Sequence, residues 1–200
     1  MKTSNSKLCM ATIAALVLIS QATLATGKAK PIETVPNLDL KSYVGVWREY
    51  AFIPFYFERM CVLDTTAEYS ILEDGRVSVK NSCVDKDGEV QVANGIAKIP
   101  DPKVASKLKV TFAKIFGKWI FTPGGDYWIM EVGANYEYAL LGSPDRKYSW
   151  ILSRTPQLER SLLVRLAEKL RDAGYNPCDL MLTPQTGGNK ERASLCTLTQ

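Results

Sequence analysis

The region between residues 46 and 153 consists of short runs rich in Val, Ile, Tyr, Phe and Trp, separated by Gly, Pro, Asp and Asn. Such runs are typical of β-strands. Eight of them follow one another at roughly even spacing, mostly with short connections. Between the second and third runs stands Asp74-Gly75, the strongest short signal for a β-hairpin. The pattern therefore predicts one all-β domain, built as an eight-stranded antiparallel up-and-down barrel or as a sandwich.

One amphipathic helix follows the strands. Thr155 is expected to cap its N-terminus, Pro156 suits the first helical position and Gly174 suits the C-terminal cap. Leucines recur every four residues and predict an apolar stripe that packs against the outside of the sheet, namely Leu158, Leu162, Leu166 and Leu170. Beyond the helix, "CDLML" could add one short strand, and residues 185–200 are expected to form a loosely ordered C-terminal tail.

Residues 1–25 have the features of a cleavable secretory signal peptide. Lys2 and Lys7 precede an apolar stretch that small residues follow, and the stretch is shorter than the roughly 20 residues that span a bilayer. A retained anchor helix is the alternative. No cysteine stands beside a plausible cleavage site, so a lipoprotein is not expected. These features predict export to the periplasm or to the extracellular space.

Charge and cysteine content exclude several classes of function. The signal removes Lys2 and Lys7 but no acidic residue, so the net charge falls from +4 to +2, and interleaved charges argue against nucleic-acid binding. The chain contains no histidine, which excludes His-dependent catalysis, and the cysteines lack the close pairs of a metal site, so no metal or cofactor is expected. Four cysteines remain and indicate two disulfides with three possible pairings: Cys61, Cys83, Cys178 and Cys196.

Alternation around the Asp74-Gly75 hairpin gives it one apolar face and one polar face. An eight-stranded barrel either fills its interior with side chains or holds one small ligand. Small and half-polar residues such as Ala67 and Tyr69 at inward positions favour a cavity, and a sealed core is the alternative. The candidate ligand-binding residues are Ala67, Tyr69, Ile71, Val79, Val110, Phe112, Ile129, Leu141, Tyr148 and Trp150.

Three motifs in order give the chain a family resemblance. "GVWREY" resembles the Gly-x-Trp motif of lipocalins, "ANYEYALL" is similar to their second motif, and "SWILSRTP" resembles the third, whose arginine precedes a helix. Gly45, Trp47, Tyr136 and Arg154 match these motifs, although Asn135 replaces the usual aspartate of the second. Longer stretches look most like bacterial outer-membrane lipocalins and apolipoprotein D-like lipocalins. The resemblance covers residues 38–184.

The resemblance implies an eight-stranded up-and-down barrel with one C-terminal helix packed on its outside. It also implies that Arg154 lies across Trp47 at the closed end, which makes Gly45, Trp47 and Arg154 structural residues. Tyr148 and Trp150 would continue from Arg154 into the interior. The aromatic residues that follow Trp47, namely Phe55, Tyr56 and Phe57, are expected at the portal.

Residues 114–125 look longer than the connection usual in the family. The aromatic residues Phe116, Trp119 and Phe121 beside Lys114 and Lys118 could contact a membrane interface or flank the ligand portal, or the segment could form a longer hairpin that packs on itself. For the disulfides, the positions of Cys61 and Cys83 at one end of the hairpin favour a bridge between them, which leaves Cys178 to pair with Cys196. The resemblance to apolipoprotein D offers a rival pairing of Cys61 with Cys196 in the tail.

The sequence and the resemblance together predict a non-enzymatic carrier of a small hydrophobic ligand, such as a fatty acid or lysophospholipid, acting in lipid handling at the cell envelope. One alternative is a lipid-modifying enzyme that uses an unpaired Cys83 or an inward-leaning Glu131. The other is a sealed barrel that acts as an interaction module through its surface.

Overall fold

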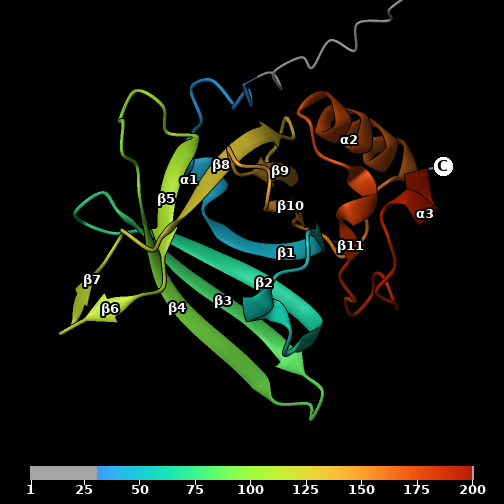
Figure 1. Ribbon diagram of the computed structural model, residues 1–200, viewed down its shortest axis with the longest axis horizontal. Coiled ribbons are helices and arrows are strands. Elements are labelled where there is room, and N and C mark those ends of the chain that lie inside the picture. The colour runs from blue at the N-terminus through green and yellow to red at the C-terminus, as the bar shows by residue number, and fades with distance from the viewer. Residues whose placement is uncertain (1–30, 200) are drawn as a thin grey trace, which may run out of the picture.

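The computed structural model describes residues 31–199, so the predicted signal peptide lies outside the described residues. Eight strands form an antiparallel barrel in which each strand pairs with the next along the chain, and β10 closes the barrel by pairing with β1 (Figure 1). This confirms the predicted up-and-down barrel. The strands are β1 Gly45–Phe52, β2 Cys61–Ile71, β3 Val77–Asp85, β4 Val90–Lys98, β5 Lys107–Thr111, β8 Gly125–Val132, β9 Tyr138–Gly142 and β10 Ser149–Ser153.

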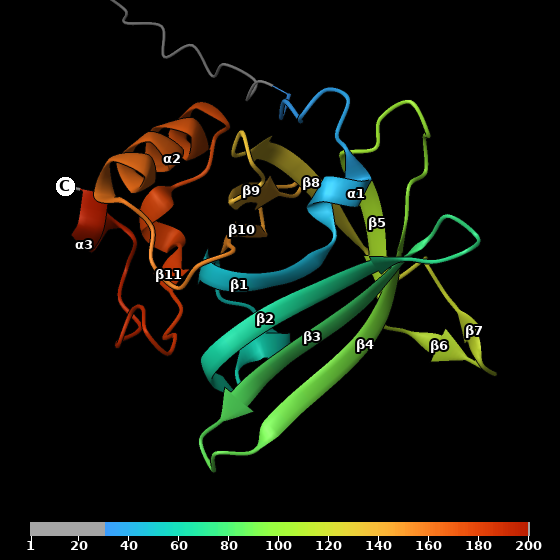
Figure 2. The ribbon, with the colours of Figure 1, turned by 180° about the vertical axis from the view of Figure 1, so that it is seen from behind.

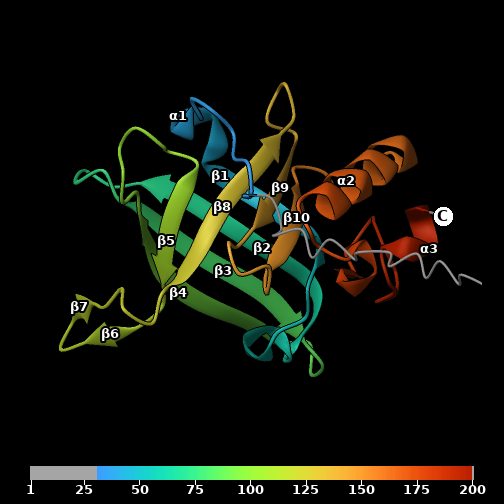
Figure 3. The same ribbon diagram turned by 45° about the horizontal axis from the view of Figure 1, so that its top comes forward.

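Shorter elements lie outside the eight barrel strands. Strands β6 (Lys114–Ile115) and β7 (Lys118–Trp119) form a separate hairpin between β5 and β8, at the end of the barrel where β1 finishes (Figure 3). Three helices, two 3-10 turns and one further strand complete the described chain: α1 Leu40–Tyr43, α2 Arg160–Asp172, α3 Cys196–Thr199, η1 Tyr56–Glu58, η2 Pro177–Asp179 and β11 Met181–Leu182.

The turn between β2 and β3 forms where the sequence predicts it. The Leu72 N–H donates to the Arg76 carbonyl at 2.8 Å, and Gly75 has φ +80°, a left-handed value that glycine adopts without steric cost. The Asp74 carboxylate accepts from the Arg76 N–H at 3.0 Å and so fixes the turn locally. Because the turn sets the register, Tyr69 lies opposite Val79 as the alternation requires.

The helix α2 is present, but its predicted start is wrong. It begins at Arg160, not at Pro156, because the Thr155 hydroxyl donates to the Gln157 carbonyl and holds a turn before the helix. Gly174 follows the last turn with φ +85°, as expected for a C-terminal cap. The buried stripe is also shifted from the predicted one, since Leu158 and Leu162 lie at its edge, and it consists of Leu163, Leu166, Ala167 and Leu170.

The prediction of a loosely ordered C-terminal tail is wrong. Strand β11, the short strand suggested by "CDLML", pairs with the end of β1, and the following residues lie where β1 and β2 diverge (Figure 2). There the Thr183 N–H donates to Tyr50 at 2.9 Å, and Pro184 accepts from Asp64 at 3.0 Å. Leu195 is completely buried against this region. The segment is ordered because it supplies the hydrogen bonds and apolar cover that the outer side of β1 needs.

Two apolar cores lie on opposite sides of the sheet. The outer core packs α2 and the C-terminal segment against outward-facing residues such as Tyr50 and Ile151. The inner core fills the barrel around Trp47, Tyr69 and Leu141. The helix therefore covers the outside of the barrel and leaves the interior to the strands, as predicted.

Candidate ligand-binding site

The floor of the barrel is built around Trp47, which is completely buried. The guanidinium of Arg154 lies 3.6 Å from the centre of the indole. Its Nη1 donates to the Val46 carbonyl at 2.7 Å, and its Nη2 donates to the carbonyls of Ser42, Tyr43 and Val44 at 2.9–3.2 Å. These contacts tie α1 to β1 and close this end of the barrel.

The backbone conformation at residue 45 calls for glycine. Its φ of +96° lies in the left-handed region, where an L side chain is strained. A Cβ at this position would lie 3.4 Å from Arg154 Nη1, an ordinary contact distance, so the backbone and not the space is the reason. The Gly-x-Trp pattern therefore has a direct geometric reason, and the arrangement of Gly45, Trp47 and Arg154 at the closed end is the one that the resemblance implies.

Three tyrosines lie directly above the floor. The Tyr127 hydroxyl is 2.6 Å from that of Tyr43 and 3.0 Å from that of Tyr69. Burial raises the pKa of each of these hydroxyls well above its ordinary value, so all three remain neutral and bond only to one another. The tyrosines thus cap the floor with a satisfied polar cluster inside an apolar shell.

The lower half of the barrel is filled by side chains. The void beside the three tyrosines measures about 10 Å³ and is lined by Leu40, Val77, Val79, Ala97, Leu108 and Val110 as well. Such a void holds at most about one water, whereas pockets for small ligands measure about 300–1,000 Å³. A lipid chain must therefore lie in the upper half, above the tyrosines, or displace them.

An aromatic wall lines one side of the upper half. Phe55 packs edge-to-face on Phe52, Tyr148 and Trp150, with ring centres 5.6–6.5 Å apart. Trp150 in turn lies 6.4 Å from Tyr127, so the aromatic contacts are continuous from the mouth to the tyrosines. Phe55, Tyr148 and Trp150 all remain partly exposed, which places them at the opening.

The opposite side of the mouth is open to solvent. Ala93 on β4 pairs with Asn81 and faces the interior by register, yet it is exposed. Phe112 is 46% exposed and lies against Gly95, where a Cβ would come within 2.8 Å of the ring. Glycine at this position makes room for the ring. The interior of the upper half is thus accessible, unlike the filled lower half.

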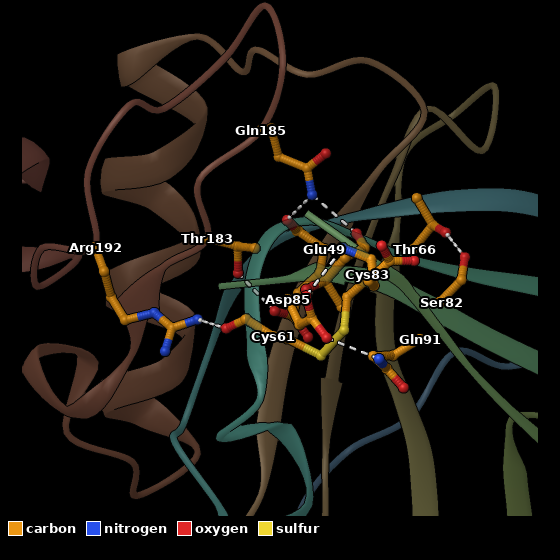
Figure 4. Close-up of a disulfide and its surroundings, with 12 residues drawn as sticks. Glu49, Cys61, Thr66, Ser82, Cys83, Asp85, Gln91, Thr183, Gln185 and Arg192 are labelled. Atoms are coloured by element: carbon orange, nitrogen blue, oxygen red, sulfur yellow. Dashed lines mark hydrogen bonds between the residues drawn. A yellow bond between two sulfur atoms is a disulfide. The ribbon is translucent and has the colours of Figure 1, made fainter. Parts of the chain in front are cut away.

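Two buried carboxyl groups, which the sequence analysis missed, lie between these two sides. Glu49 is 4% exposed and accepts a hydrogen bond from the Thr183 hydroxyl at 2.6 Å; Figure 4 shows it beside the Cys61–Cys83 disulfide. Glu58, at the end of η1, forms a hydrogen bond with Glu49. Glu49 stands two residues after Trp47 and could have been placed inward by alternation. No sequence signal marked Glu58, because η1 brings it in from a loop.

Burial dominates the ionisation of this pair. It raises the pKa of Glu49 to about 7, against the smaller opposite effect of the Thr183 hydrogen bond. Burial raises the pKa of Glu58 to about 10, and the negative charge of Glu49 acts in the same direction. Near neutral pH Glu58 therefore keeps its proton, and the pair carries at most one negative charge.

Both disulfides follow the pairing favoured from the sequence. Cys61 bonds to Cys83 with a Cα–Cα distance of 5.5 Å, and Cys178 bonds to Cys196 with a distance of 5.0 Å. The rival pairing of Cys61 with Cys196 is therefore wrong. The first bridge joins β2 to β3 near the mouth, and the second fastens the C-terminal segment next to η2.

Most of the ten candidate ligand-binding residues lie inside the barrel. Two of them, Val110 and Trp150, pack against the inner core, and five are buried in it: Ala67, Tyr69, Val79, Ile129 and Leu141. The prediction that Ile71 faces the interior is wrong. Its side chain is 41% exposed, because β2 continues past the floor and carries this residue outside the barrel interior. Phe112, Tyr148 and Trp150 lie at the mouth. Whether any of them contacts a ligand stays a prediction.

The structure also gives the positions of the predicted portal residues and of the two residues considered for an enzyme. Tyr56 and Phe57 are 70% and 76% exposed on η1, beside the mouth. Cys83 is engaged in a disulfide, so the enzyme alternative loses its candidate thiol. Glu131 faces outward: it pairs with Lys169 of α2 at 2.7 Å. Neither residue is therefore available to act on a molecule in the barrel.

The hairpin β6–β7 agrees with one of the two interpretations of residues 114–125, a longer hairpin, and contact with a membrane stays a prediction. It packs on itself, because Lys114 lies over Trp119 with its Nζ 4.0 Å from the ring centre. At its tip, however, Ile115 is 54% exposed and Phe116 is fully exposed. Phe116 has φ +48° and Gly117 has φ +77°, so a bulky side chain occupies a left-handed position that favours glycine or asparagine. Within residues 31–199, no helix is sufficiently long and apolar to span a membrane.

Comparisons with known proteins agree with this architecture. The sequence model of the lipocalin-like domain family matches residues 38–185. The chain is 37% identical over 158 residues to temperature-induced lipocalin-1 of Arabidopsis thaliana, which covers 78% of this chain and 84% of the relative. It is 33% identical over 161 residues to outer membrane lipoprotein Blc of Vibrio cholerae, and the match covers 80% of this chain and 90% of the relative.

Apolipoprotein D of Rattus norvegicus is 32% identical over 161 residues, covering 76% of this chain and 79% of the relative. Among solved structures, insecticyanin of the tobacco hornworm Manduca sexta superposes with a TM-score of 0.62 at 22% identity, over 80% of this chain and 87% of that one. Family members bind small hydrophobic ligands inside such barrels. With the closed barrel, the floor of Gly45, Trp47 and Arg154, the outer helix and these relatives in agreement, the chain belongs to the lipocalin family.

Proposed function

We propose that this protein carries a single-chain lipid, a fatty acid or a lysophospholipid, in the upper half of its barrel. The observation that supports this is the accessible interior between the aromatic wall of Phe55, Tyr148 and Trp150 and the exposed inner face of β4. Each buried methylene contributes about 0.8 kcal/mol, so ten give about 8 kcal/mol before the cost of association. An apolar chain therefore binds usefully without special chemistry.

The segment around η1 acts as the portal in this proposal. The Phe55 ring makes aromatic contacts with Phe52, Phe57, Tyr148 and Trp150, and its neighbours Tyr56 and Phe57 face solvent. Moving this segment outward uncovers Trp150 and enlarges the mouth, and it breaks the contact of Glu58 with Glu49 but no hydrogen bond between barrel strands. The ligand would enter here and lie against the aromatic wall.

The tip of the hairpin β6–β7 docks on a membrane surface. Phe116 combines full exposure with an unfavourable backbone conformation, an arrangement that burial in a lipid interface would compensate. Lys114 and Lys118 flank it and suit an anionic surface. Since the hairpin lies at the same end of the barrel as the mouth, docking would bring the portal close to its lipid source. The two disulfides suit an oxidising compartment, in keeping with export.

The alternative of a sealed barrel rests on the filled lower half. It differs from the carrier in one measurable property, because a sealed barrel retains no lipid. The purified protein would be extracted with organic solvent for mass spectrometry, and a neutral fluorescent probe, N-phenyl-1-naphthylamine, would be titrated into the delipidated protein. Recovery of lipid and saturable probe binding are expected. If no lipid is recovered and no probe binds at micromolar concentration, the carrier proposal is wrong.

A pair of tryptophan variants localises the site. Trp150→Ala removes the centre of the aromatic wall and should weaken probe binding at least tenfold, about 1.4 kcal/mol. Trp128→Ala is the matched control, because Trp128 packs in the outer core and Lys107 covers its ring at 4.3 Å. Equal loss of binding in both variants would mean that the effect is on stability and not on a site in the mouth.

A further inference from the structure

The inner surface of the mouth carries a cluster of hydrogen-bond acceptors. We call Glu49, Glu58 and Asn81 the mouth cluster. Asn81 lies on the inner face of β3, where it pairs with Ala67, next to the cross-strand row that holds Glu49. The Oδ1 atom of Asn81 and the Oε2 atom of Glu58 are both buried without a hydrogen-bond partner. Unpartnered buried acceptors are costly, so each favours a molecule that can donate a hydrogen bond.

Positive charge is kept away from the barrel interior. The lysines and arginines of the eight barrel strands all alternate with inward-facing residues and so point outward: Arg48, Lys80, Lys98, Lys107 and Lys109. The cation that acts on the mouth cluster is Arg192, which lowers the pKa of both carboxyl groups only weakly. Its guanidinium donates to the Cys61 carbonyl at 2.9 Å and lies 5.2 Å from the Phe52 ring, so it is already engaged (Figure 4).

The mouth therefore has an acidic and acceptor-rich side facing an aromatic side. We infer that the mouth cluster selects ligands by their polar end and favours a lipid whose head donates hydrogen bonds and carries no negative charge, an ammonium or a hydroxyl group, over the carboxylate of a fatty acid. This inference rests on the proposed carrier function and narrows it.

The physical reason is the low dielectric of the site. A carboxylate placed beside the mouth cluster would meet the unpartnered acceptors Asn81 Oδ1 and Glu58 Oε2 and the negative charge of Glu49, which adds to the cost of its desolvation. An ammonium would form a charge-assisted hydrogen bond with Glu49, and a hydroxyl would donate to Asn81 Oδ1 or to Glu58 Oε2. The raised pKa of Glu58 agrees with this, since it shows that the site tolerates one negative charge but not two.

The test compares three ligands with the same alkyl chain: decylamine, decanol and decanoate. Each would displace N-phenyl-1-naphthylamine from the full-length mature protein at about pH 8, where the amine and the acid are both ionised. We expect decylamine and decanol to displace the probe at concentrations at least about tenfold lower than decanoate, a difference of about 1.4 kcal/mol. Equal potency of the three ligands, or a preference for decanoate, would overturn the inference.

Matched variants assign the preference to the mouth cluster. Glu49→Gln should reduce the difference between decylamine and decanoate to about threefold or less, because it removes the one negative charge of the carboxyl pair. Glu68→Gln is the control, since Glu68 lies on the outer face of β2, 46% exposed in a surface pair with Lys80. A preference that survives unchanged in Glu49→Gln would assign it elsewhere and refute the role of the cluster.

These outcomes separate the inference from the proposal beneath it. If the probe does not bind the wild-type protein at all, the carrier function fails. If the probe binds but the three head groups compete equally, the carrier function stands and the inference fails. Circular dichroism shows whether each variant is folded, and the comparison in the wild-type protein decides the question even where a variant does not fold.

Discussion

Replacing Arg154 by alanine should destabilise the protein more than any other single surface-accessible charge change. The variant loses the cation–π contact with Trp47, worth about 1–2 kcal/mol. It also leaves four carbonyls, those of Ser42, Tyr43, Val44 and Val46, without their charged donor. Charged hydrogen bonds contribute about 1.5–3 kcal/mol each, but these share one guanidinium that is partly exposed, so they do not add fully. The expected loss is about 3–5 kcal/mol.

The assay is urea unfolding followed by far-ultraviolet circular dichroism, with the free energy obtained by linear extrapolation. Arg165→Ala is the control, because Arg165 pairs with the Glu131 carboxylate on the exposed side of α2, and its loss should change stability by about 0–1 kcal/mol. Arg154→Lys should recover only part of the loss, since one ammonium cannot serve four carbonyls. If Arg154→Ala destabilises the protein no more than Arg165→Ala does, the contacts of Arg154 with Trp47 and the four carbonyls do not hold the floor together.

Three other predictions concern the disulfide near the mouth, the carboxyl pair and the hairpin tip. The double variant Cys61→Ala/Cys83→Ala should lose about 3 kcal/mol, because the bridge closes a loop with a sequence separation of 22, and thermal unfolding with and without reductant measures this. Burial raises the pKa of Glu49 to about 7 and of Glu58 to about 10, so the folded state binds these protons more tightly than the unfolded state. Their contribution is fully present below their unfolded pKa of 4.5 and is lost as the pH rises through the folded values. Urea midpoints should therefore fall less between about pH 5 and pH 9 in Glu58→Gln than in the wild-type protein, and parallel pH profiles would contradict this. Phe116→Asn should abolish sedimentation with anionic vesicles while leaving stability equal or slightly higher, since asparagine suits φ +48°; unchanged sedimentation would exclude the hairpin tip as the docking point.

Features that depend on neighbouring residues were predictable from the sequence. The Asp74-Gly75 turn and the alternation on either side of it define the register of β2 and β3 without help from distant segments. The start of α2 was not predictable in this way. Thr155 satisfies the rules for an N-cap, yet in the fold its hydroxyl donates to the Gln157 carbonyl and the helix begins later. Alternation also failed at Ile71, because it indicates a face of the strand and not where the barrel interior ends.

The mouth cluster shows most clearly what the sequence cannot supply. Glu49 comes from β1, Glu58 from η1 and Asn81 from β3, and the segment around Thr183 completes the surroundings of Glu49 only after the C-terminal chain has packed between β1 and β2. The family motifs, by contrast, all lie at the floor, where Gly45, Trp47 and Arg154 have a structural task. Family membership therefore predicts how the barrel closes and says little about what its mouth accepts. Ligand choice has to be argued from the residues of this chain that line the mouth, and those place acceptors, a single negative charge and an aromatic wall around the head group.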